Sequence, residues 1–592
     1  MELYFGKNTA EHEGYEKRIS FHNFMVWTKT LDNGREHYYD FVIDDVLYII
    51  FGNVYDTQNF YGKNPAELCA KSYIDGGLDK VFEIDGDFIF VRLVSDNELT
   101  VLQSNYGGPN IYYKLSAADR EFSTDASLLL GDFTESDIDE RSVCDYLLYG
   151  EMIGGNTFSK RVKALLRGQS LTVEEGNVMV ANLRTIHFDS KYSTLDEDEI
   201  IKALTEKYLN AVYKRAQGDV AESAMFLSGG KDSRLLLSAF SELFSDKITC
   251  ISFGQFGSDE TQNAGITASI NNNPFILINL TPNDHIKNAD RYIKESIGMD
   301  WFPQSYVISV LDQIKGFSKL YTGSNLSDIC FHSKYMDRNI GTFTGDFTDY
   351  MRQHHSQARL NGFTREKLRW ICGNKSEGLY ELDHLDEDTA KYGGRPEETF
   401  VGYLNNSNGA NQISFRTNVF AGKYMDVLDP SQDKEYVKEI CHLPLSLRLS
   451  DTIHVKMISR INSNYLKPVY NDYKIPMQVS QSYREKAAAI EKQREQLYIE
   501  MMREWNPNHK DKFYYPHDYA DFNGYMKYDE TWISYMNEML LDKESIIYKK
   551  FFVYERVEQM LYEQRNDIAN WKKELILLTS LEKFLRIYCR RK

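Results

Sequence analysis

The segment FLSGGKDSRLLL, residues 226–237, contains the residues with the clearest chemical potential in the chain. Its apolar ends predict a strand before the two glycines and a helix after them. A helix that begins directly after glycines exposes backbone N–H groups and the positive end of its dipole, and both favour a bound anion. Asp232 suits the Mg²⁺ that accompanies phosphates better than a phosphate itself. The segment therefore predicts a phosphate site, and a glycine turn with an Asp-Ser helix cap is the alternative.

The residues around this glycine turn alternate between strand and helix patterns. Helical periodicity covers residues 198–218, 233–244 and 258–270, and short apolar runs typical of strands cover residues 220–227, 247–254 and 273–280. Alternation of this length predicts a parallel sheet built from βαβ units, with the glycine turn directly after one of its strands.

The amino-terminal part of the chain has a different pattern. Residues 1 to about 185 contain short runs rich in Val, Ile, Phe and Tyr, separated by Gly, Asp and Asn. These runs predict a strand-rich domain, with helices near residues 66–77 and 140–150 and a hairpin over residues 166–183.

The carboxyl-terminal part is mostly helical in pattern from about residue 430. Residues 335–415 are polar, and we expect them to form an irregular insertion or lid. The predicted domains are residues 1–185, which are strand-rich, and residues 195–592, which hold the parallel sheet and the helical region.

Composition limits the classes of function. A chain of 592 residues is expected to hold two or three domains. Its net charge of −18 disfavours general binding to nucleic acid or to anionic membranes. The seven cysteines have no CxxC pair, which disfavours both a disulfide framework and a structural zinc site. Because no signal peptide and no apolar run of roughly 18 residues is present, we expect a soluble cytoplasmic protein.

The glycine turn resembles the SGGxDS loop of the PP-loop ATP pyrophosphatases, enzymes that split ATP into AMP and pyrophosphate. The matching residues are Ser228, Gly229, Gly230, Asp232 and Ser233. The resemblance implies that this loop, with Leu227 before it, binds ATP and holds the departing pyrophosphate.

The order of the whole chain resembles glutamine-dependent asparagine synthetase and its relatives, such as β-lactam synthetase, carbapenam synthetase and the lasso-peptide cyclases. Similar segments follow in the family's order, at residues 103–113, 150–173, 321–328, 426–449 and 577–586. The resemblance implies an α/β and α+β multidomain fold. An Ntn-like β-sandwich with flanking helices would precede a PP-loop, adenine nucleotide α-hydrolase-like, parallel-sheet domain with a helical carboxyl-terminal region.

The amino-terminal domain lacks the residues that hydrolyse glutamine in this family. Its nucleophile is a cysteine after the initiator methionine, but Glu2 stands here and the first cysteine is Cys69. In the segment that matches the oxyanion hole, Phe51 replaces the first asparagine and Gly52 remains. Thiolate attack on glutamine needs both a nucleophile and oxyanion donors, so we expect no glutamine hydrolysis.

The synthetase part keeps more of the family's residues. Gly323 and Asp328 match the glycine and the second metal-binding aspartate, so Asp232 and Asp328 would share Mg²⁺ between the phosphates of ATP. Lys474 matches the lysine that stabilises charge during acyl transfer. The alternatives are a turn or helix-cap role for Asp328 and a solvated surface position for Lys474.

Six further positions follow from the resemblance or lie beside its motifs. Ser252 and Phe253 match the strand that lines the adenine. Ser324 replaces the family's catalytic Glu or Tyr, and a serine is a poor general base at neutral pH. Arg234 either reaches a phosphate or packs on the helix, and the acidic pair 259–260 is interpreted as an ordinary helix start.

These residues predict an ATP-dependent, AMP- and pyrophosphate-forming ligase that joins a substrate carboxylate to an amine, with ATP and Mg²⁺ as cofactors. A natural-product, modified-peptide or glycan pathway would suit it. A nucleotide-binding scaffold without turnover is the alternative. PP-loop chemistry on tRNA is disfavoured by the net charge of −18 and by the absence of paired cysteines. The acid, the amine, ring closure and a homodimer stay open.

Overall fold

The computed structural model describes most of the chain. The described residues are 2–7, 11–30, 37–55, 64–104, 108–116, 120–183, 186–216, 220–323, 339–358, 362–376, 378–405, 420–450, 452–470, 475–480 and 519–589, with short stretches between 482 and 501. Within these ranges, no helix combines the length and the apolar character that a membrane span requires.

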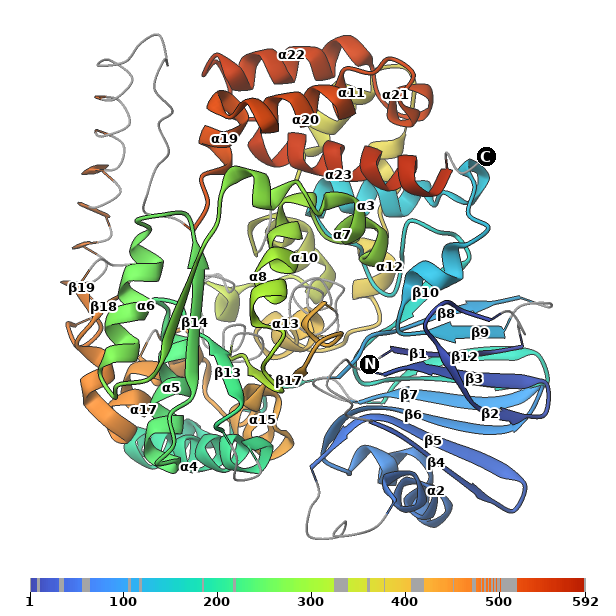
Figure 1. Cartoon of the computed structure of the whole chain (residues 1–592), viewed down its shortest axis with the longest axis vertical. Coiled ribbons are helices and arrows are strands. Elements are labelled where there is room, and N and C mark those ends of the chain that lie inside the picture. Colours follow the sequence, from blue (N-terminus) through green and yellow to red (C-terminus); the bar gives the residue numbers. More distant parts are fainter. Residues whose placement is uncertain are drawn as a thin grey trace.

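The amino-terminal part is a sandwich of two six-stranded antiparallel sheets (Figure 1). One sheet has the order β10-β8-β9-β1-β3-β2, with β1 Glu2–Gly6, β2 Glu16–Phe21, β3 Phe24–Lys29, β8 Ile111–Leu115, β9 Arg120–Ser123 and β10 Val162–Leu165. The other has the order β12-β11-β7-β6-β5-β4, with β4 Tyr38–Ile43, β5 Val46–Val54, β6 Gly86–Ser95, β7 Glu98–Gln103, β11 Gln169–Glu174 and β12 Asn177–Asn182. The predicted hairpin over residues 166–183 is confirmed as β11 and β12.

Strand β5 explains why the sequence of this sandwich contains continuous apolar runs. Its side chains alternate between the two faces of the sheet, as the pleat of a strand requires. Leu47 and Ile49 enter the core between the sheets, whereas Tyr48 and Ile50 pack under α2, Pro65–Phe82. Because both faces are covered, both sets of positions are apolar.

The second part contains a five-stranded parallel sheet with the order β15-β14-β13-β16-β17. The strands are β13 Ser223–Phe226, β14 Thr249–Gly254, β15 Phe275–Asn279, β16 Lys319–Tyr321 and β17 Asp426–Leu428, and the helices are α4 Glu197–Ala216, α5 Lys231–Leu243, α6 Asp259–Ser269, α7 Ala289–Glu295 and α8 Tyr306–Ile314. This confirms the predicted βαβ alternation. From β13 the chain first builds the sheet outward through β14 and β15, and then returns to add β16 on the opposite side of β13. The direction of winding therefore changes between β13 and β16, and ligands bind at such switch points in open α/β sheets.

The carboxyl-terminal region is helical, as predicted. Its elements are α15 Lys434–Cys441, α16 Leu445–Arg448, α17 Ile453–Asn462, α19 Phe522–Tyr528, α20 Glu530–Leu540, α21 Ile546–Lys550, α22 Tyr554–Arg565 and α23 Lys572–Cys589, with a short hairpin of β18 Val469–Tyr470 and β19 Ile475–Pro476. Helices α4 and α17 pack against α5, and α23 packs on α3, Glu140–Tyr149 (Figure 1).

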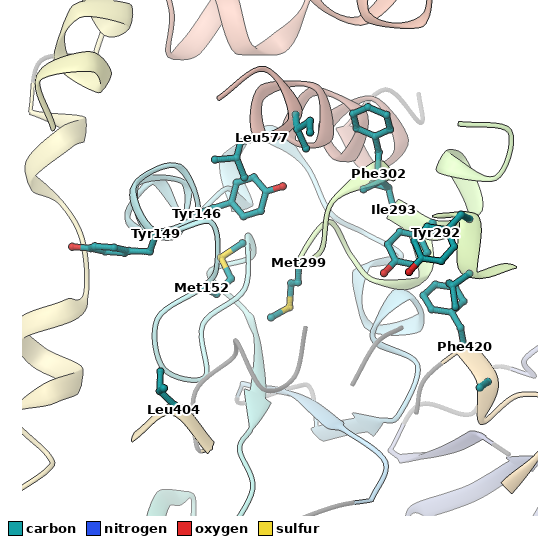
Figure 2. Packing of buried hydrophobic residues seen from close by; sticks show 14 of the residues in the cluster. Tyr146, Tyr149, Met152, Tyr292, Ile293, Met299, Phe302, Leu404, Phe420 and Leu577 are labelled. Carbon is teal, nitrogen blue, oxygen red and sulfur yellow. The ribbon is translucent and has the colours of Figure 1, made fainter. Parts of the chain in front are cut away.

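One continuous apolar core joins the two parts. Figure 2 shows side chains from segments far apart in the sequence packing together, among them Tyr146, Met152, Met299 and Leu577. The same cluster continues to Leu236 of α5, beside the glycine turn. The sandwich is therefore a structural support for the parallel sheet as well as a separate layer.

The prediction of irregular structure for residues 335–415 is wrong for the described residues. They form α10 Phe347–Ala358, α11 Arg365–Cys372, α12 Leu385–Thr389 and α13 Pro396–Asn405. These helices are 5 to 12 residues long, so each offers at most about three turns of apolar periodicity. Helix α11 buries Leu368, Ile371 and Cys372, and the Thr364 side chain caps it by accepting from the Lys367 N–H. Helices α10 and α11 pack against α3 of the sandwich.

A buried carboxylate fastens this helical segment to α3. Asp145 is fully buried and accepts from the backbone N–H of His384 at 2.9 Å, with Nδ1 of the same histidine 2.7 Å away. Burial raises the pKa of Asp145 to about 6, although its bonds with His384 lower it. A carboxyl group with a raised pKa in the folded state stabilises the fold most when protonated, and this stability is lost as the pH rises through about 6.

We therefore expect wild type to gain stability relative to Asp145→Asn as the pH falls. The gain should be about 1 kcal/mol between pH 7 and pH 5, because asparagine does not titrate. Urea unfolding of both proteins at the two pH values measures it. Asp246→Asn, at an exposed position, is the matched control. A stability difference independent of pH would contradict the assignment.

Candidate functional site

The glycine turn lies between β13 and α5, as predicted. Gly230 precedes the first helical residue, Lys231, and no side chain caps this helix start. The Gly230 N–H donates to Ser228 Oγ at 3.1 Å, and the Ser228 N–H donates to Ser233 Oγ at 3.2 Å. The two serines therefore hold the turn in shape. The alternative of an Asp-Ser helix cap does not describe this geometry.

Asp232 lies in the first turn of α5 and contacts a residue that the sequence did not single out. Its side chain is 18% exposed, and Oδ1 is 2.8 Å from Nε2 of His454, which is 1% exposed. His454 belongs to the buried face of α17, together with Met457 and Ile458. Its only sequence signal is a place on an apolar helical stripe, which more often marks a core residue than a site residue.

The loop after β16 reaches the glycine turn. Gly323 lies two residues after the end of this strand, and a Cβ at Gly323 would be 3.4 Å from the carbonyl oxygen of Asp232 and 3.6 Å from Cβ of Leu236. The Thr322 N–H donates to the carbonyl oxygen of Leu428 at 3.0 Å, which continues the pairing of β16 with β17. The sheet thus brings Gly323 and Asp232 together at its switch point.

Three predicted site residues lie outside the described part of the chain. Ser324 and Asp328 belong to residues 324–338, and Lys474 belongs to residues 471–474. Their roles stay predictions. In the described ranges, no three or more His, Cys, Asp or Glu side chains come together in a way that could hold a metal ion.

The residues matched to the adenine region lie on the neighbouring strand. Ser252 is buried on β14, and Phe253 is half-buried there, with its ring centroid 5.3 Å from that of Phe226 and 5.4 Å from that of Tyr306. The Leu227 N–H donates to the carbonyl oxygen of Ile251 at 2.8 Å and extends the β13–β14 pairing. The carboxyl ends of adjacent strands therefore carry Leu227, Ser252 and Phe253.

Hydrogen bonds show the roles of residues 259–260 and of Arg234, which lie beside the motifs of the site in the sequence. Ser258 caps α6 by accepting from the Thr261 N–H, so residues 259–260 are the ordinary helix start that we predicted. Arg234 is buried and donates to backbone carbonyls, including those of Gly229 and Pro468. It packs beneath the turn.

Glu2, at the position where the resemblance predicts a nucleophile, forms a structural ion pair. Glu2 is buried, Oε1 is 2.7 Å from Nζ of Lys423, and the hydroxyl of Tyr15 donates to Oε2 at 3.1 Å. Burial raises the pKa of Glu2, but the charges of Lys423 and Lys29 outweigh it and leave the pKa below its ordinary value. A paired carboxylate here is an anchor between the two parts of the chain, because Lys423 also lies 2.6 Å from Glu295.

The segment that resembles an oxyanion hole, around Phe51 and Gly52, also makes structural contacts. Phe51 is buried in the core of the sandwich, and the Gly52 N–H donates to the carbonyl oxygen of His37 at 2.9 Å. Gly52 has φ +124°, and a Cβ there would lie 2.3 Å from the carbonyl oxygen of Asp87. A cavity of about 90 Å³ beside these residues has no Cys, Ser or Thr in the part of its lining that the structure describes.

Comparisons with known proteins name no family. No family model matches the chain, and no curated protein matches it. Among solved structures, glutamine phosphoribosylpyrophosphate amidotransferase from B. subtilis, complexed with ADP and GMP, aligns with 11% identity and a TM-score of 0.18 over 43% of this chain and 51% of that one. This chain thus spans about half the length of that enzyme.

Two further structures align as weakly. NH3-dependent NAD synthetase from Campylobacter jejuni, in complex with the nitrate ion, has 14% identity and a TM-score of 0.19, over 32% of this chain and 93% of that one. An allosteric regulatory enzyme of purine biosynthesis has 9% identity and a TM-score of 0.19, over 65% and 85%. TM-scores this low carry no argument, so the fold and the site are interpreted from the chain's own geometry. At the switch point of the parallel sheet lie the glycine turn Ser228–Ser233, Gly323 after β16 and the carboxylate of Asp232.

Proposed function

We propose that this chain is an ATP-dependent carbon–nitrogen ligase of the asparagine synthetase type that forms AMP and pyrophosphate without hydrolysing glutamine. The observation that carries the proposal is the meeting of the Ser228–Ser233 turn with Gly323 at the switch point of the parallel sheet. The motif that the sequence matches to an ATP-binding loop lies at the edge of the sheet where open α/β sheets bind ligands.

The residues of the turn fit the phosphates of ATP. Helix α5 is 13 residues long, so the N–H groups of its first turn and its dipole favour an anion at the end where Gly229 and Gly230 lie. The side chains of Ser228 and Ser233 bond to each other and to the N–H groups of Ser228 and Gly230, so a bound phosphate is proposed to replace some of these bonds within the turn.

The carboxylates fit Mg²⁺, which prefers oxygen ligands. Asp232 is partly exposed at the turn, and Asp328 follows Gly323 in sequence. When bound there, Mg²⁺ would neutralise charge on the departing pyrophosphate. His454 would hold the Asp232 carboxylate from behind, as residues outside the ligand set commonly do for metal-binding carboxylates.

The proposed chemistry has two steps. A carboxylate oxygen of the substrate attacks the α-phosphorus of ATP, the bond between the α-phosphorus and its bridging oxygen to the β-phosphate breaks, and pyrophosphate leaves. The nitrogen of an amine then attacks the acyl carbon of the adenylate, AMP leaves, and the nitrogen loses a proton. Lys474 is proposed to stabilise the negative charge in this second step.

The amine is proposed to come from the substrate or from a second molecule, rather than from glutamine. Glu2 and Gly52 support this, because one is held in an ion pair and the N–H of the other is already bonded. A ligase of this kind suits a natural-product, modified-peptide or glycan pathway. The second candidate is a scaffold that binds nucleotide without turnover. One feature supports it, the presence of Ser324 where the resemblance predicts a catalytic Glu or Tyr.

Calorimetry of the wild-type chain with ATP, with and without Mg²⁺, tests the proposal first. We expect binding that requires Mg²⁺. Exchange of labelled pyrophosphate into ATP, measured over a panel of amino, hydroxy and peptide carboxylic acids, then tests the adenylation step. Absence of ATP binding would refute both proposals, whereas Mg²⁺-dependent binding with no exchange over the whole panel would favour the scaffold.

A further inference from the structure

Arg234 is a buried cation that bonds to backbone carbonyls, whereas buried Arg215 has a carboxylate partner. It lies in the first turn of α5 and is 0% exposed. Its guanidinium donates to the carbonyl oxygen of Pro468 at 2.8 Å, to that of Gly229 at 3.0 Å and to that of Val469. All three acceptors are neutral backbone groups.

Arg234 has no ion pair with a carboxylate in the part of the chain that the structure describes. Buried Arg215, in contrast, lies 3.0 Å from a carboxylate oxygen of Asp433. Burial lowers the pKa of Arg234 to about 10, so the side chain still carries its charge at neutral pH. An uncompensated buried charge is costly, and a fold keeps it where an anion or a precise position requires it.

The three acceptors belong to two segments that the proposed reaction uses. Gly229 is in the middle of the glycine turn. Pro468 and Val469 lie at the start of the β18–β19 hairpin, in which Val469 pairs with Pro476. The connection between these two strands includes Lys474 in the sequence. One side chain thus joins the turn to the hairpin that carries the proposed charge-stabilising lysine.

We propose that Arg234 is a positioning residue that locks the glycine turn to the β18–β19 hairpin, and that its buried charge favours a polyphosphate anion in front of the turn. This inference rests on the proposed function, because the anion is the pyrophosphate part of ATP. Arg234 reaches Gly229 from the carbonyl side, so it acts through the backbone of the turn. The hydrogen bonds of Arg234 fix the position of the turn relative to the hairpin, and its charge raises the affinity of the turn for pyrophosphate.

Two substitutions separate these contributions. Arg234→Met removes both the charge and the bonds to the carbonyls. We expect it to weaken Mg²⁺–pyrophosphate binding about 10-fold or more, because it removes both a buried positive charge near the anion and the bonds that hold the backbone of the turn. Arg234→Lys keeps a cation but loses the rigid fork that serves several carbonyls at once. It should leave pyrophosphate affinity within about 3-fold and KM for ATP nearly unchanged, while kcat for amide formation falls about 10-fold.

The experiment uses the full chain, with Mg²⁺–pyrophosphate as the probe. Calorimetry gives its affinity for wild type, Arg234→Met, Arg234→Lys and the control Arg448→Met. Arg448 is also buried and donates to a backbone carbonyl, that of Glu397, so its loss tests the general cost of removing a buried arginine. The control should lower thermal stability and leave pyrophosphate affinity unchanged.

Hydrogen exchange provides a readout that needs no ligand. The Leu466 carbonyl accepts from the Met477 N–H at the base of the hairpin, so the Met477 amide is a reporter of how firmly the hairpin is held. We expect this amide to exchange faster in both Arg234 variants and at the wild-type rate in Arg448→Met. If Arg234→Met does not fold, Arg234→Lys and its exchange decide the question.

The outcomes distinguish the inference from the function on which it rests. Wild-type affinity for pyrophosphate in Arg234→Met, or unchanged Met477 exchange in both variants, would overturn the role of Arg234 and leave the ligase standing. If wild type itself binds neither ATP nor pyrophosphate, the proposed function fails first. Faster exchange in the Arg234 variants together with the weakened affinity supports the proposal.

Discussion

Replacement of Asp232 by asparagine should abolish the Mg²⁺-dependent part of ATP binding. Asparagine keeps the shape of the side chain and a carbonyl oxygen beside His454, but it removes the charge that Mg²⁺ requires. Loss of one charged interaction of this kind is worth about 2–3 kcal/mol, which corresponds to roughly 30–150-fold in affinity. Calorimetry with and without Mg²⁺ measures the effect directly.

The control for this prediction lies beyond the other end of the same helix. Asp246→Asn removes an exposed carboxylate after α5 and should leave both ATP affinities at their wild-type values. Circular dichroism and the thermal midpoint of Asp232→Asn should match wild type, because the contact with His454 can be kept by the amide. Equal dependence on Mg²⁺ in wild type and in Asp232→Asn would exclude Asp232 as the metal ligand.

Replacement of Arg215 by methionine should cause the largest loss of stability. The guanidinium at the end of α4 is 3.0 Å from Asp433 and 3.7 Å from Asp87, and it lies over the ring of Tyr55 at 4.4 Å. Asp87 and Tyr55 belong to the sandwich, so this cation holds the sandwich and the parallel-sheet part together. Its removal leaves buried Asp87 without this cation and leaves Asp433 with Lys214 alone, at a cost of about 3–5 kcal/mol.

The pH dependence of this loss identifies its cause. Burial raises the pKa of Asp87 to about 6 even with Arg215 present. Burial also raises the pKa of Asp433, but the charges of Arg215 and Lys214 outweigh it and hold that pKa below its ordinary value. Without Arg215 both carboxyl groups will protonate more readily, and a protonated group needs no cation. We therefore expect a smaller loss of stability at pH 5 than at pH 8.

Urea unfolding at the two pH values, followed by tryptophan fluorescence, measures this prediction. Arg141→Met is the matched control, since Arg141 pairs with Glu387 at the surface, where an ion pair contributes at most about 1 kcal/mol. Equal midpoints for Arg215→Met and Arg141→Met would show that the junction between the two parts does not depend on the buried network.

The sequence by itself determined most of the local structure. The glycine turn between a strand and a helix, the βαβ alternation and the β11–β12 hairpin all follow from periodicity and from glycine, which act over a few neighbouring residues. The presence of Glu2, where the resemblance predicts a cysteine, was also readable, because it depends on one residue. The helices between residues 347 and 405 were missed, since elements of 5 to 12 residues give too little periodicity to detect.

Only the tertiary structure decided which residues meet around the turn. His454 lies against Asp232, Arg234 bonds to Pro468, and Gly323 touches the first turn of α5. Each contact joins segments about 90 to 234 residues apart, and it exists because the order of strands places β16 beside β13 and the packing of α17 places a buried face on α5. Periodicity records which face of an element is buried, but not against which partner, and the partner of each of these residues is set by the packing of the whole core.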